Sequence, residues 1–364
     1  MNILFAYQET DLTDNLFVVS LIKSLRDKKL QIDSSVDLFW NTDIKYDLIH
    51  IQWPEELFKW RSVCKEDISK LTTRINQLKS NGIKLVYTRH NSQPHYQDNN
   101  LIEVYKIIEN SVDSIIHLGS FSKNESINSM HFSENIYHTI IPHHIYLGYY
   151  NTNINQSDSR TKLGIPNKSL VILVFGKFRN LREKITVLLS YIFFSQSNKF
   201  LLAPRLFTYT NTRFGKRFIN KLVSLSAKIF EKIFHAKLMI DSEIVSQDLL
   251  PYYLTASDIV FIQRRKILNS GNIPLAFLFK KVVIGPNIGN VEELLISSGN
   301  PIFNPKSISS INRAFLQGVS LLKQDKGNNN YNYAIDNLSI DYITNLHIIL
   351  YNKIITGETQ KSCL

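Results

Sequence analysis

Two stretches of the sequence place arginines beside residues whose backbone can approach an anion closely. In the first, Arg179 and Arg182 follow Gly176, which comes directly after an apolar run ending at Phe175. Glycine permits close approach of the backbone, and the planar guanidinium group matches phosphate oxygens. A spacing of three residues puts both arginines side by side on one helix turn. This stretch therefore predicts a phosphate-binding loop.

The second stretch also follows an apolar run. Arg264 begins a basic triplet, and Asn269, Ser270 and Gly271 precede an apolar segment that is predicted as a short helix. Amides at a helix start point at a bound anion, and the helix dipole favours its negative charge. A nucleotide-linked ligand is therefore the first hypothesis for this chain.

A third group of polar residues follows the apolar run at 84–88. His90, Asn91 and His95 are candidates for catalysis or binding, because functional loops often follow the carboxyl ends of strands. A lone histidine is more often structural, and His90 is the better candidate because it comes directly after the strand. His143 follows the last predicted strand of the first half, and we expect it to face a cleft between two domains.

No metal site is predicted. The spacing of the histidines matches no local metal-binding pattern, and the sequence has no Asp-x-Asp triplet to hold a divalent metal on a diphosphate. We expect cationic side chains and helix dipoles to neutralise the phosphates instead. The two cysteines cannot form a disulfide framework and lack zinc-site spacing, which fits a reducing cytoplasm.

Short apolar runs alternate with longer amphipathic segments, a rhythm that predicts parallel sheets covered by helices on both faces. The predicted strands are 2–6, 36–40, 48–52, 84–88, 114–118 and 137–141 in the first half, and 170–175, 200–203, 236–240, 258–262 and 282–285 in the second. The chain has 364 residues, too many for one ordinary core. We therefore predict an α/β protein with two Rossmann-like domains facing a central cleft, with ligands beyond the strand ends.

The predicted domain boundaries follow from this rhythm. The first domain covers 1–150, and the polar segment 151–160 lacks apolar periodicity and is predicted as a linker. The second domain covers 161–340. The segment 341–364 is predicted to contain a helix that closes the structure.

The charge balance narrows the classes of partner. Lysine plus arginine total 42 against 31 for aspartate plus glutamate, a net charge of +11. Such a charge suits nucleic acid, an anionic membrane or a phosphate-bearing small molecule. The basic residues are dispersed and no nucleic-acid motif is present, so nucleic acid is not expected as a partner. No signal peptide or bilayer-spanning run is recognised, so we expect a cytoplasmic protein, with peripheral contact at the inner face of the membrane left open.

The segment 213–235 is a basic amphipathic helix by its pattern. Its apolar residues share one face, and lysines lie elsewhere on the helix. The favoured interpretation is a helix of the second domain that packs on its sheet. The alternative is a helix that docks on an anionic membrane surface.

In order and spacing, these motifs resemble those of the GT-B glycosyltransferases, specifically the retaining group 1 or family 4-like class. The segments that carry the resemblance are DLIHIQWPE at 47–55, TRHNSQPH at 88–95, IPHHIY at 141–146, GKFRNLR at 176–182, LNSG at 268–271 and VVIGP at 282–286. The resemblance extends over nearly the whole chain.

The resemblance implies an enzyme of hexosyltransferase type that moves a sugar from a nucleoside diphosphate sugar to an acceptor hydroxyl, with retention and without a metal ion. The nucleotide sugar is a co-substrate, and no cofactor is implied. By resemblance, the donor lies mainly in the second domain and the acceptor mainly in the first. The implied catalytic residues are His90, Arg179 and Arg182; the donor-binding residues are Gly176, Arg179, Arg182, Arg264, Asn269, Ser270 and Gly271; and the acceptor or cleft residues are Tyr7, Trp53, Asn91, His95, His143 and Tyr146.

The expected acceptor is a glycan or lipid-linked glycan in the assembly of a surface polysaccharide. The sequence departs from the class at two points. No carboxylate lies between Asp258 and Glu292, where the class has paired glutamates, and the segment 6–9 replaces a glycine-rich loop. Two alternatives therefore stay open: a sugar-nucleotide epimerase of GT-B-like fold, and a non-catalytic sugar-nucleotide-binding or scaffold protein of a glycan-assembly complex.

Overall fold

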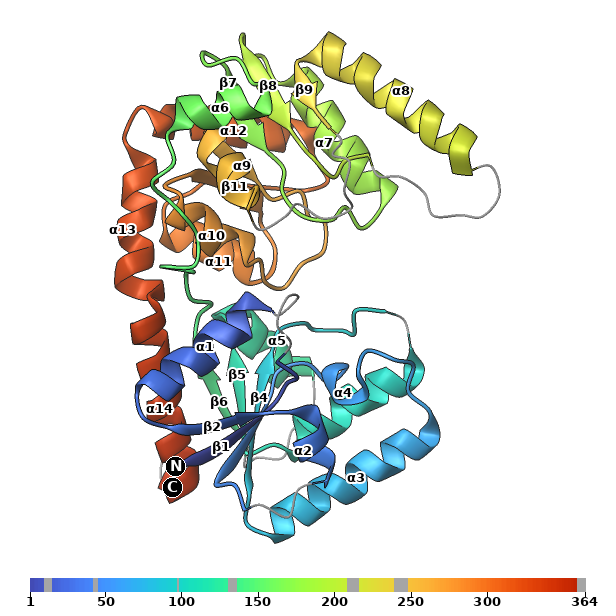
Figure 1. Ribbon diagram of the computed structural model, residues 1–364, viewed down its shortest axis with the longest axis vertical. Coiled ribbons are helices and arrows are strands. Elements are labelled where there is room, and N and C mark those ends of the chain that lie inside the picture. Colours follow the sequence, from blue (N-terminus) through green and yellow to red (C-terminus); the bar gives the residue numbers. More distant parts are fainter. Residues whose placement is uncertain are drawn as a thin grey trace. The chain divides into compact units, whose positions relative to one another are not determined.

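The computed structural model describes residues 1–9, 15–41, 45–96, 98–129, 136–207, 216–238 and 248–358 (Figure 1). The chain divides into two compact units, of which unit 1 comprises Met1–His144 with Leu338–Leu364 and unit 2 comprises Ile145–Asn337. Each unit contains a six-stranded parallel sheet. Both units are therefore α/β domains, as the β-α-β rhythm predicts.

The sheet of unit 1 has the strand order β2-β1-β3-β4-β5-β6. Its strands are β1 (Asn2–Ala6), β2 (Gln31–Ser34), β3 (Leu48–Ile51), β4 (Lys84–Arg89), β5 (Ser114–His117) and β6 (Tyr137–Ile140). Its helices are α1 (Leu16–Asp27), α2 (Val36–Asn41), the 3₁₀ turn η1 (Glu56–Phe58), α3 (Lys65–Ser80), α4 (Asn99–Ser111), α5 (Ser120–Ser129) and α14 (Ile340–Thr356). The strand order reverses between β1 and β3, where a sheet of this type places its ligand.

Helices cover both faces of this sheet. Leu71 of α3 and Leu101 of α4 pack with Ile49 of β3 in one buried cluster. On the opposite face, His50 of β3 forms a hydrogen bond with Tyr351 of α14, with 2.7 Å between Nδ1 and the phenolic oxygen. Helices α1 and α14 pack against each other. The helix predicted within 341–364 thus belongs to unit 1.

The sheet of unit 2 has the order β12-β11-β10-β7-β8-β9. Its strands are β7 (Leu170–Leu173), β8 (Lys199–Leu202), β9 (Ala236–Lys237), β10 (Ile259–Phe261), β11 (Val282–Pro286) and β12 (Ile302–Phe303). Its helices are α6 (Gln156–Leu163), α7 (Leu181–Phe193), α8 (Lys216–Phe234), α9 (Leu250–Ala256), α10 (Asn272–Leu278), α11 (Gly289–Ser297), α12 (Ile308–Leu322) and α13 (Lys326–Leu338). Here the order reverses between β7 and β10, as in dinucleotide-binding sheets.

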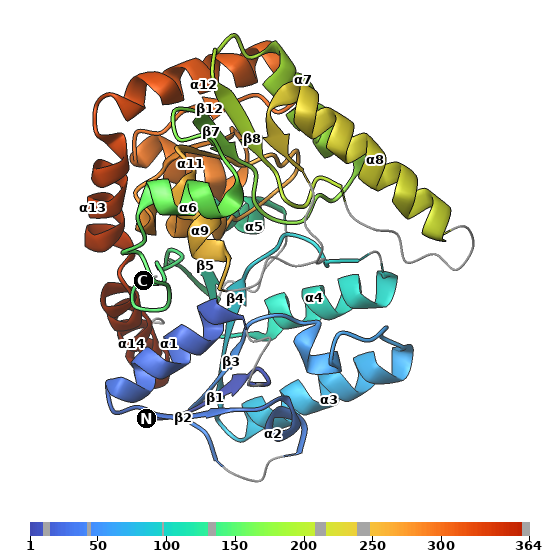
Figure 2. The same cartoon turned by 45° about the horizontal axis from the view of Figure 1, so that its top comes forward.

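One buried cluster defines the inner face of three helices of unit 2. It joins Val187 of α7 and Phe315 of α12 to Ile172 of β7 and Phe261 of β10, and Phe230 of α8 packs against it. Helices α7, α8 and α12 therefore share one face of the sheet, an arrangement that can be followed in Figures 1 and 2. Right-handed crossovers put α9, α10 and α11 on the other face.

Two local predictions differ from the structure. The segment 36–40, predicted as a strand from its aromatic and β-branched residues, is helix α2. Ser35 accepts the Leu38 amide at 3.2 Å, and the helix buries Val36 and Phe39 on one side. The second strand of the sheet is Gln31–Ser34 instead.

The predicted linker 151–160 is helical from Gln156 onward. Asn155 caps helix α6 by accepting the Ser157 amide at 2.8 Å. Arg160 turns inward and forms an ion pair with Asp258 at 2.8 Å. The helix is held by this cap and ion pair, which a search for apolar periodicity does not detect.

None of the helices described has the length and apolar content needed to cross a bilayer.

Candidate functional site

In unit 2, the loop after β7 lies against the start of α10. Gly176 has a φ of +101°, in the left-handed region that favours glycine. A Cβ atom at this position would lie 3.3 Å from Nδ2 of Asn272. That amide nitrogen donates to the Phe175 carbonyl at 3.1 Å. The two stretches that the sequence predicts to bind phosphate therefore meet at the point where the strand order reverses.

A cluster of arginines lies beside this loop. Arg264 forms an ion pair with Glu183 at 3.0 Å, and their side chains are only 14% and 2% exposed. The same Glu183 oxygen accepts the backbone N–H of Arg179 at 2.9 Å. Arg179 also donates from Nη1 to the Lys266 carbonyl at 3.3 Å, which ties the β7 loop to the β10 loop.

The electrostatics of this cluster favour an anion. Burial lowers the pKa of Arg264, Glu183 opposes that change, and the charges of Arg179 and Arg205 add to it. Glu183 pairs with the guanidinium of Arg264 but accepts only the backbone N–H of Arg179, whose guanidinium donates to a neutral carbonyl, so positive charge is in excess at the ends of β7 and β10. A phosphate placed here would gain charge-assisted hydrogen bonds.

The Ser-Gly step begins α10 as the sequence predicts. The Ile273 amide donates to the Ser270 carbonyl at 3.2 Å, and the Leu275 amide donates to the Gly271 carbonyl at 3.3 Å. Within the described part of the chain, the amides of Gly271 and Asn272 have no hydrogen-bond acceptor. These two donors are therefore available to a bound anion.

A third loop, after β11, contacts the segment that precedes α10. Nδ2 of Asn290 donates to Oδ1 of Asn269 at 2.6 Å, and the Asn290 amide donates to the Leu268 carbonyl at 2.9 Å. Gly289 makes this approach feasible, because its φ is +61° and a Cβ atom would lie 2.4 Å from the Ile267 carbonyl oxygen.

Replacement of Gly289 by alanine is expected to displace the loop that carries Asn269. The Cβ atom would collide with backbone at 2.4 Å, whereas at Gly164, where φ is +67°, nothing lies within 4 Å. Gly164→Ala therefore has only the left-handed backbone cost of about 1–2 kcal/mol, and Gly289→Ala should cost at least about 1 kcal/mol more. Urea unfolding of both variants measures the difference. Equal losses in the free energy of unfolding of the two variants would show that the close contact at Gly289 does not contribute to the cost.

In unit 1, aromatic side chains gather at the carboxyl ends of the central strands. His90 stacks on Trp53 with ring centroids 4.2 Å apart, and Tyr7 lies 6.4 Å from Trp53. Phe17 of α1 contacts His90 edge-on at 5.2 Å and His143 at 4.5 Å. Four predicted site residues, Tyr7, Trp53, His90 and His143, are therefore joined with Phe17 in one chain of ring contacts.

His90 is held by a chain of hydrogen bonds through the sheet. Its Nε2 lies 2.9 Å from Oε1 of Gln52, so that Nε2 is the donor. Nε2 of fully buried Gln52 lies 3.1 Å from Nε2 of His50, which in turn lies 2.8 Å from Oγ1 of Thr88. This chain fixes the ring of His90 against Trp53.

The histidines of this site should make unit 1 sensitive to acid. Burial lowers the pKa of His90 and of His143 to about 3 each, and nearby histidines add to the effect at both residues. Both are therefore neutral near pH 7, while in the unfolded chain they take up protons near pH 6.5. Between pH 6.5 and 3 the unfolded state binds more protons, so the free energy of unfolding falls as the pH falls.

The free energy of unfolding is expected to fall by up to about 1.4 kcal/mol per pH unit for each histidine. Urea unfolding at pH 7.5 and pH 5 measures it. His90→Gln removes one titrating group and should flatten the pH dependence. An unchanged slope in His90→Gln would contradict this explanation.

Asn91 and His95 lie beside the buried carboxylate of Glu55, which the sequence did not identify as a candidate site residue. Nδ2 of Asn91 lies 3.3 Å from Nε2 of His95, and Nδ1 of His95 lies 3.1 Å from Oε1 of Glu55. Glu55 is fully buried and accepts the Tyr105 hydroxyl at 2.9 Å. Burial tends to raise the pKa of Glu55, but hydrogen bonds from His95 and Tyr105 hold it below its usual value.

Glu56, the next residue, accepts the Gln8 amide at 3.3 Å and the Trp60 indole N–H. Both carboxylates could have been predicted as site residues from their position in the Trp-Pro-Glu-Glu segment, which follows β3.

No protein-family model and no curated protein sequence matches the chain. Solved structures, in contrast, are similar to it over nearly its whole length. A sucrose-phosphate synthase from Thermosynechococcus elongatus superposes with a TM-score of 0.70 at 13% identity and covers 98% of this chain and 99% of that chain. HepE of Anabaena in complex with UDP superposes with a TM-score of 0.70 at 14% identity over 97% of this chain and 100% of that chain.

The catalytic domain of starch synthase IV from Arabidopsis thaliana, bound to ADP and acarbose, is also similar. Its TM-score is 0.64 at 9% identity, over 97% of this chain and 99% of that chain. The chain has the GT-B fold. At these identities the similarity establishes the fold alone. The predicted GT-B fold with two Rossmann-like domains is confirmed.

Two further predicted site residues of this GT-B protein are Arg182 and Tyr146. Arg182 is exposed in the first turn of α7, and no hydrogen bond or ion pair is found for it within the described residues. Tyr146 belongs to unit 2, where its ring lies 6.3 Å from that of Tyr150, while the other predicted acceptor residues belong to unit 1. Their roles stay predictions.

No group of three or more potential metal ligands occurs among the residues that the structure describes.

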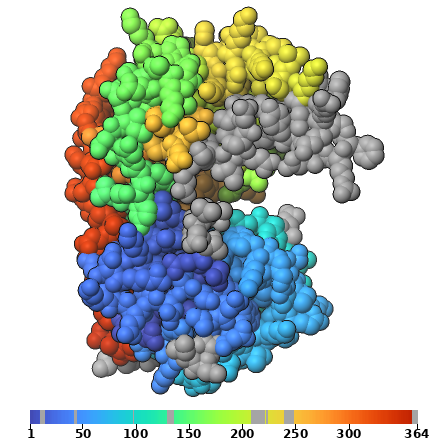
Figure 3. All heavy atoms as spheres, in the orientation of Figure 1, coloured from blue at the N-terminus to red at the C-terminus, as the bar shows by residue number. Residues whose placement is uncertain are grey.

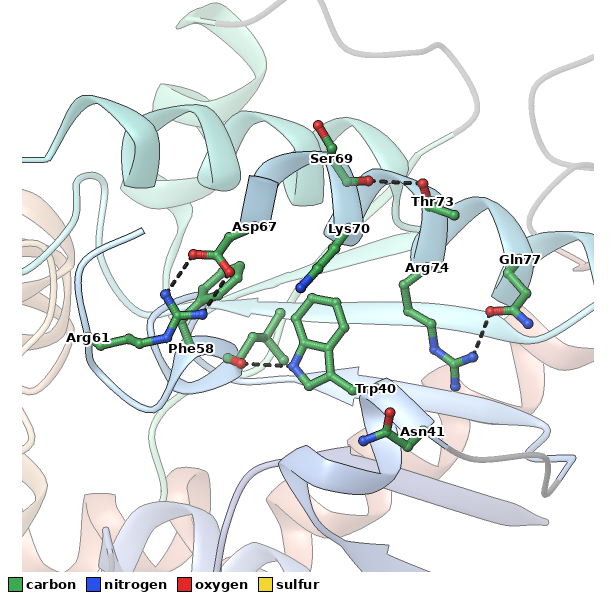
Figure 4. Close-up of a pocket in the computed structure, with 11 residues that line it drawn as sticks. Trp40, Asn41, Phe58, Arg61, Asp67, Ser69, Lys70, Thr73, Arg74 and Gln77 are labelled. Carbon is green, nitrogen blue, oxygen red and sulfur yellow. Dashed lines mark hydrogen bonds and ion pairs between the residues drawn. The ribbon is translucent and has the colours of Figure 1, made fainter. Parts of the chain in front are cut away.

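Unit 1 of the GT-B fold also has an open groove of about 650 Å³ between α2, η1 and α3. Figure 4 shows Lys70 and Arg74 reaching from α3 toward Trp40 of α2. The indole N–H of Trp40 donates to the Leu57 carbonyl at 2.9 Å, and Arg74 donates to Oε1 of Gln77 at 2.9 Å. None of the predicted site residues lines this groove.

Proposed function

We propose that the protein is a glycosyltransferase that moves a sugar from a nucleoside diphosphate sugar to an acceptor hydroxyl. The observation that carries this proposal is the cationic cluster of Arg179 and Arg264 at the point where the unit 2 sheet reverses its strand order. Ligands of doubly wound sheets bind at this position. Structures of HepE, which shares the fold, hold UDP and UDP-glucose.

In the proposed donor site, the diphosphate lies between the loop after β7 and the start of α10. Gly176 allows the backbone to approach the phosphates, and Arg179 and Arg182 neutralise their charge. The amides that follow Ser270 provide further donors. These groups would stabilise the charge that develops on the departing phosphate, and such electrostatic stabilisation is commonly the largest contribution to catalysis. On this proposal neutralisation does not require a metal ion.

In the proposed acceptor site, unit 1 provides an aromatic wall formed by Tyr7, Trp53 and His143. His90, with a pKa of about 3, is a weak base at neutral pH. An efficient general base has a pKa near the working pH. We therefore propose that neutral His90 hydrogen-bonds a sugar hydroxyl, and that the leaving phosphate takes the acceptor proton with retention of configuration.

The proposed setting is the assembly of a surface polysaccharide or related glycan, in which the acceptor is a glycan or a lipid-linked glycan. A sugar-nucleotide epimerase and a non-catalytic binding protein are distinguished by the products. An epimerase converts the donor without an acceptor, and a binding protein leaves it unchanged.

A thermal-shift screen with UDP, GDP, ADP and dTDP and their sugar derivatives tests the proposal. A ligand at a hundredfold its dissociation constant adds about 2.7 kcal/mol of stability, so one base should raise the melting temperature clearly. The stabilising sugar nucleotide is then incubated with glycan acceptors, and transfer is followed by mass spectrometry. If no nucleotide changes the melting temperature, the donor site proposed for unit 2 is wrong.

A further inference from the structure

Helix α8 presents an apolar stripe to solvent on the side away from the core. Its inner side carries Ala227, which is buried, and Phe230, which packs against the core cluster of unit 2. Leu225, Ile229 and Ile233 are spaced four residues apart and are 55%, 51% and 62% exposed. A spacing of four places these side chains in one row along the helix. Helix α8 is therefore apolar on two sides, and only one of them is used by the fold.

Helix α7 repeats this arrangement. Val187 and Tyr191 face the core, while Leu181, Ile185 and Leu189 form an exposed row with the same spacing of four. Two further exposed residues of α7, Ile192 and Phe193, extend this row at its end. Exposed apolar residues are ordinary when scattered singly, but continuous rows on adjacent helices mark interaction surfaces.

The two rows belong to neighbouring helices on one face of the sheet. Helix α7 connects β7 to β8, and α8 connects β8 to β9, which are consecutive neighbours in the sheet. Right-handed crossovers in the same direction place such helices side by side on one face. Figures 1 and 2 show α7 and α8 in this arrangement, and Figure 3 shows α8 on the outer surface of unit 2.

The charge beside the rows is positive. Lys221, Lys228 and Lys232 are exposed and lie next to the apolar row on α8. Helix α8 has one carboxylate, Glu231, and it accepts the Leu238 amide beyond the end of the helix at 2.6 Å. An exposed apolar row with lysines along its edge is the pattern of helices that lie in the interface of an anionic bilayer.

We propose that the eight exposed side chains of α7 and α8, here named the α7–α8 face, dock on the surface of a membrane that contains anionic lipid. The side chains are Leu181, Ile185, Leu189, Ile192, Phe193, Leu225, Ile229 and Ile233. A second copy of the chain fits this face less well, because each copy has a net charge of +11 and would bring its own lysines to the contact. Anionic headgroups attract the same lysines. This inference does not depend on the reaction that the protein catalyses.

Vesicle flotation of the full-length protein tests the proposal. The vesicles contain phosphatidylcholine alone, or phosphatidylcholine with about a third phosphatidylglycerol. We expect binding to the anionic vesicles, weaker binding to the neutral ones and partial loss of binding in high salt. Lys228→Ala should weaken partitioning about fivefold, since one surface lysine contributes about 1 kcal/mol to binding. Lys306→Ala, an exposed lysine remote from the face in sequence, should have a smaller effect.

A matched pair of variants distinguishes the contribution of the α7–α8 face to vesicle binding from that of the net charge. Leu225→Glu and Ile296→Glu change similarly exposed aliphatic residues of unit 2, 55% and 58% exposed, but Ile296 lies on α11, on the opposite face of the sheet. Leu225→Glu should reduce vesicle binding more than about tenfold, and Ile296→Glu should lower it only through its charge. Equal losses in both variants, or no binding of the native protein to anionic vesicles, overturn the proposal. A native dimer that Leu225→Glu dissociates also overturns it, since the face would then join two copies.

Discussion

Arg179→Ala is expected to lower kcat/KM for the nucleotide sugar by about a hundredfold. Arg179 connects the two loops of the proposed donor site by donating to the Lys266 carbonyl at 3.3 Å. Its charge adjoins that of Arg264, whose pKa responds to it. Removal of one charged donor to a developing oxyanion typically costs about 3 kcal/mol, which corresponds to this factor. Initial rates at varied donor concentration measure the effect.

Lys177→Ala is the matched control for this experiment. Lys177 is exposed in the same loop, two positions before Arg179, and has no assigned role in the proposed site. Its variant should keep kcat/KM within about threefold of the native value. If both variants lose activity equally, general positive charge in the loop matters, and the specific placement of Arg179 does not.

Arg89→Met is expected to destabilise unit 1 by about 3–5 kcal/mol. Arg89 ends β4 directly before His90, and its side chain is only 3% exposed. It pairs with Glu109 at 3.0 Å and with Glu125 at 2.8 Å, and Glu109 is 2% exposed. Removal of the guanidinium leaves a buried carboxylate without its partner, and this is the cause of the large loss. Urea unfolding at pH 7 measures the loss.

The double variant Arg89→Met with Glu109→Leu tests the cause. It removes both charges. Its loss in the free energy of unfolding should be smaller than the sum of the two single losses by about 1–3 kcal/mol. Arg61→Met is a contrasting control, because Arg61 pairs with Asp67 at 2.6 Å but is 56% exposed. It should change stability by less than about 1 kcal/mol. Additive single losses at Arg89 and Glu109 would show that the pair is not coupled.

The fold could be predicted because strands buried on both faces are continuous apolar runs. The run LVIL of β7 is an example, as are the five-residue strands β1 and β11. The two-residue strand β12 (Ile302–Phe303) is too short to leave such a run. The misassigned segment 36–40 has the composition of a strand, and the Ser35 cap and the burial of Phe39 make it helical. Tertiary contacts therefore override local composition at this point.

The candidate site could be predicted in part because loops after parallel strands share one edge of the sheet. This rule places Gly176, Arg179 and Arg264 at one edge of the second sheet from the sequence alone. It could not identify Glu183 as the partner of Arg264, because the two residues are 81 positions apart. Glu55 was missed for the same reason, since its burial depends on His95 and Tyr105, which are 40 and 50 positions further along. Periodicity describes elements and carries no information on which polar side chains pair across them.

A crystal structure of the full-length protein with the nucleoside diphosphate selected by the thermal screen tests the central claim most directly. We predict that the diphosphate binds in unit 2 beyond the carboxyl ends of β7 and β10, with oxygens within about 3 Å of the Arg179 guanidinium and the Gly271 amide. A nucleotide bound elsewhere, with the loop at Gly176 and the start of α10 left without phosphate, would contradict the account.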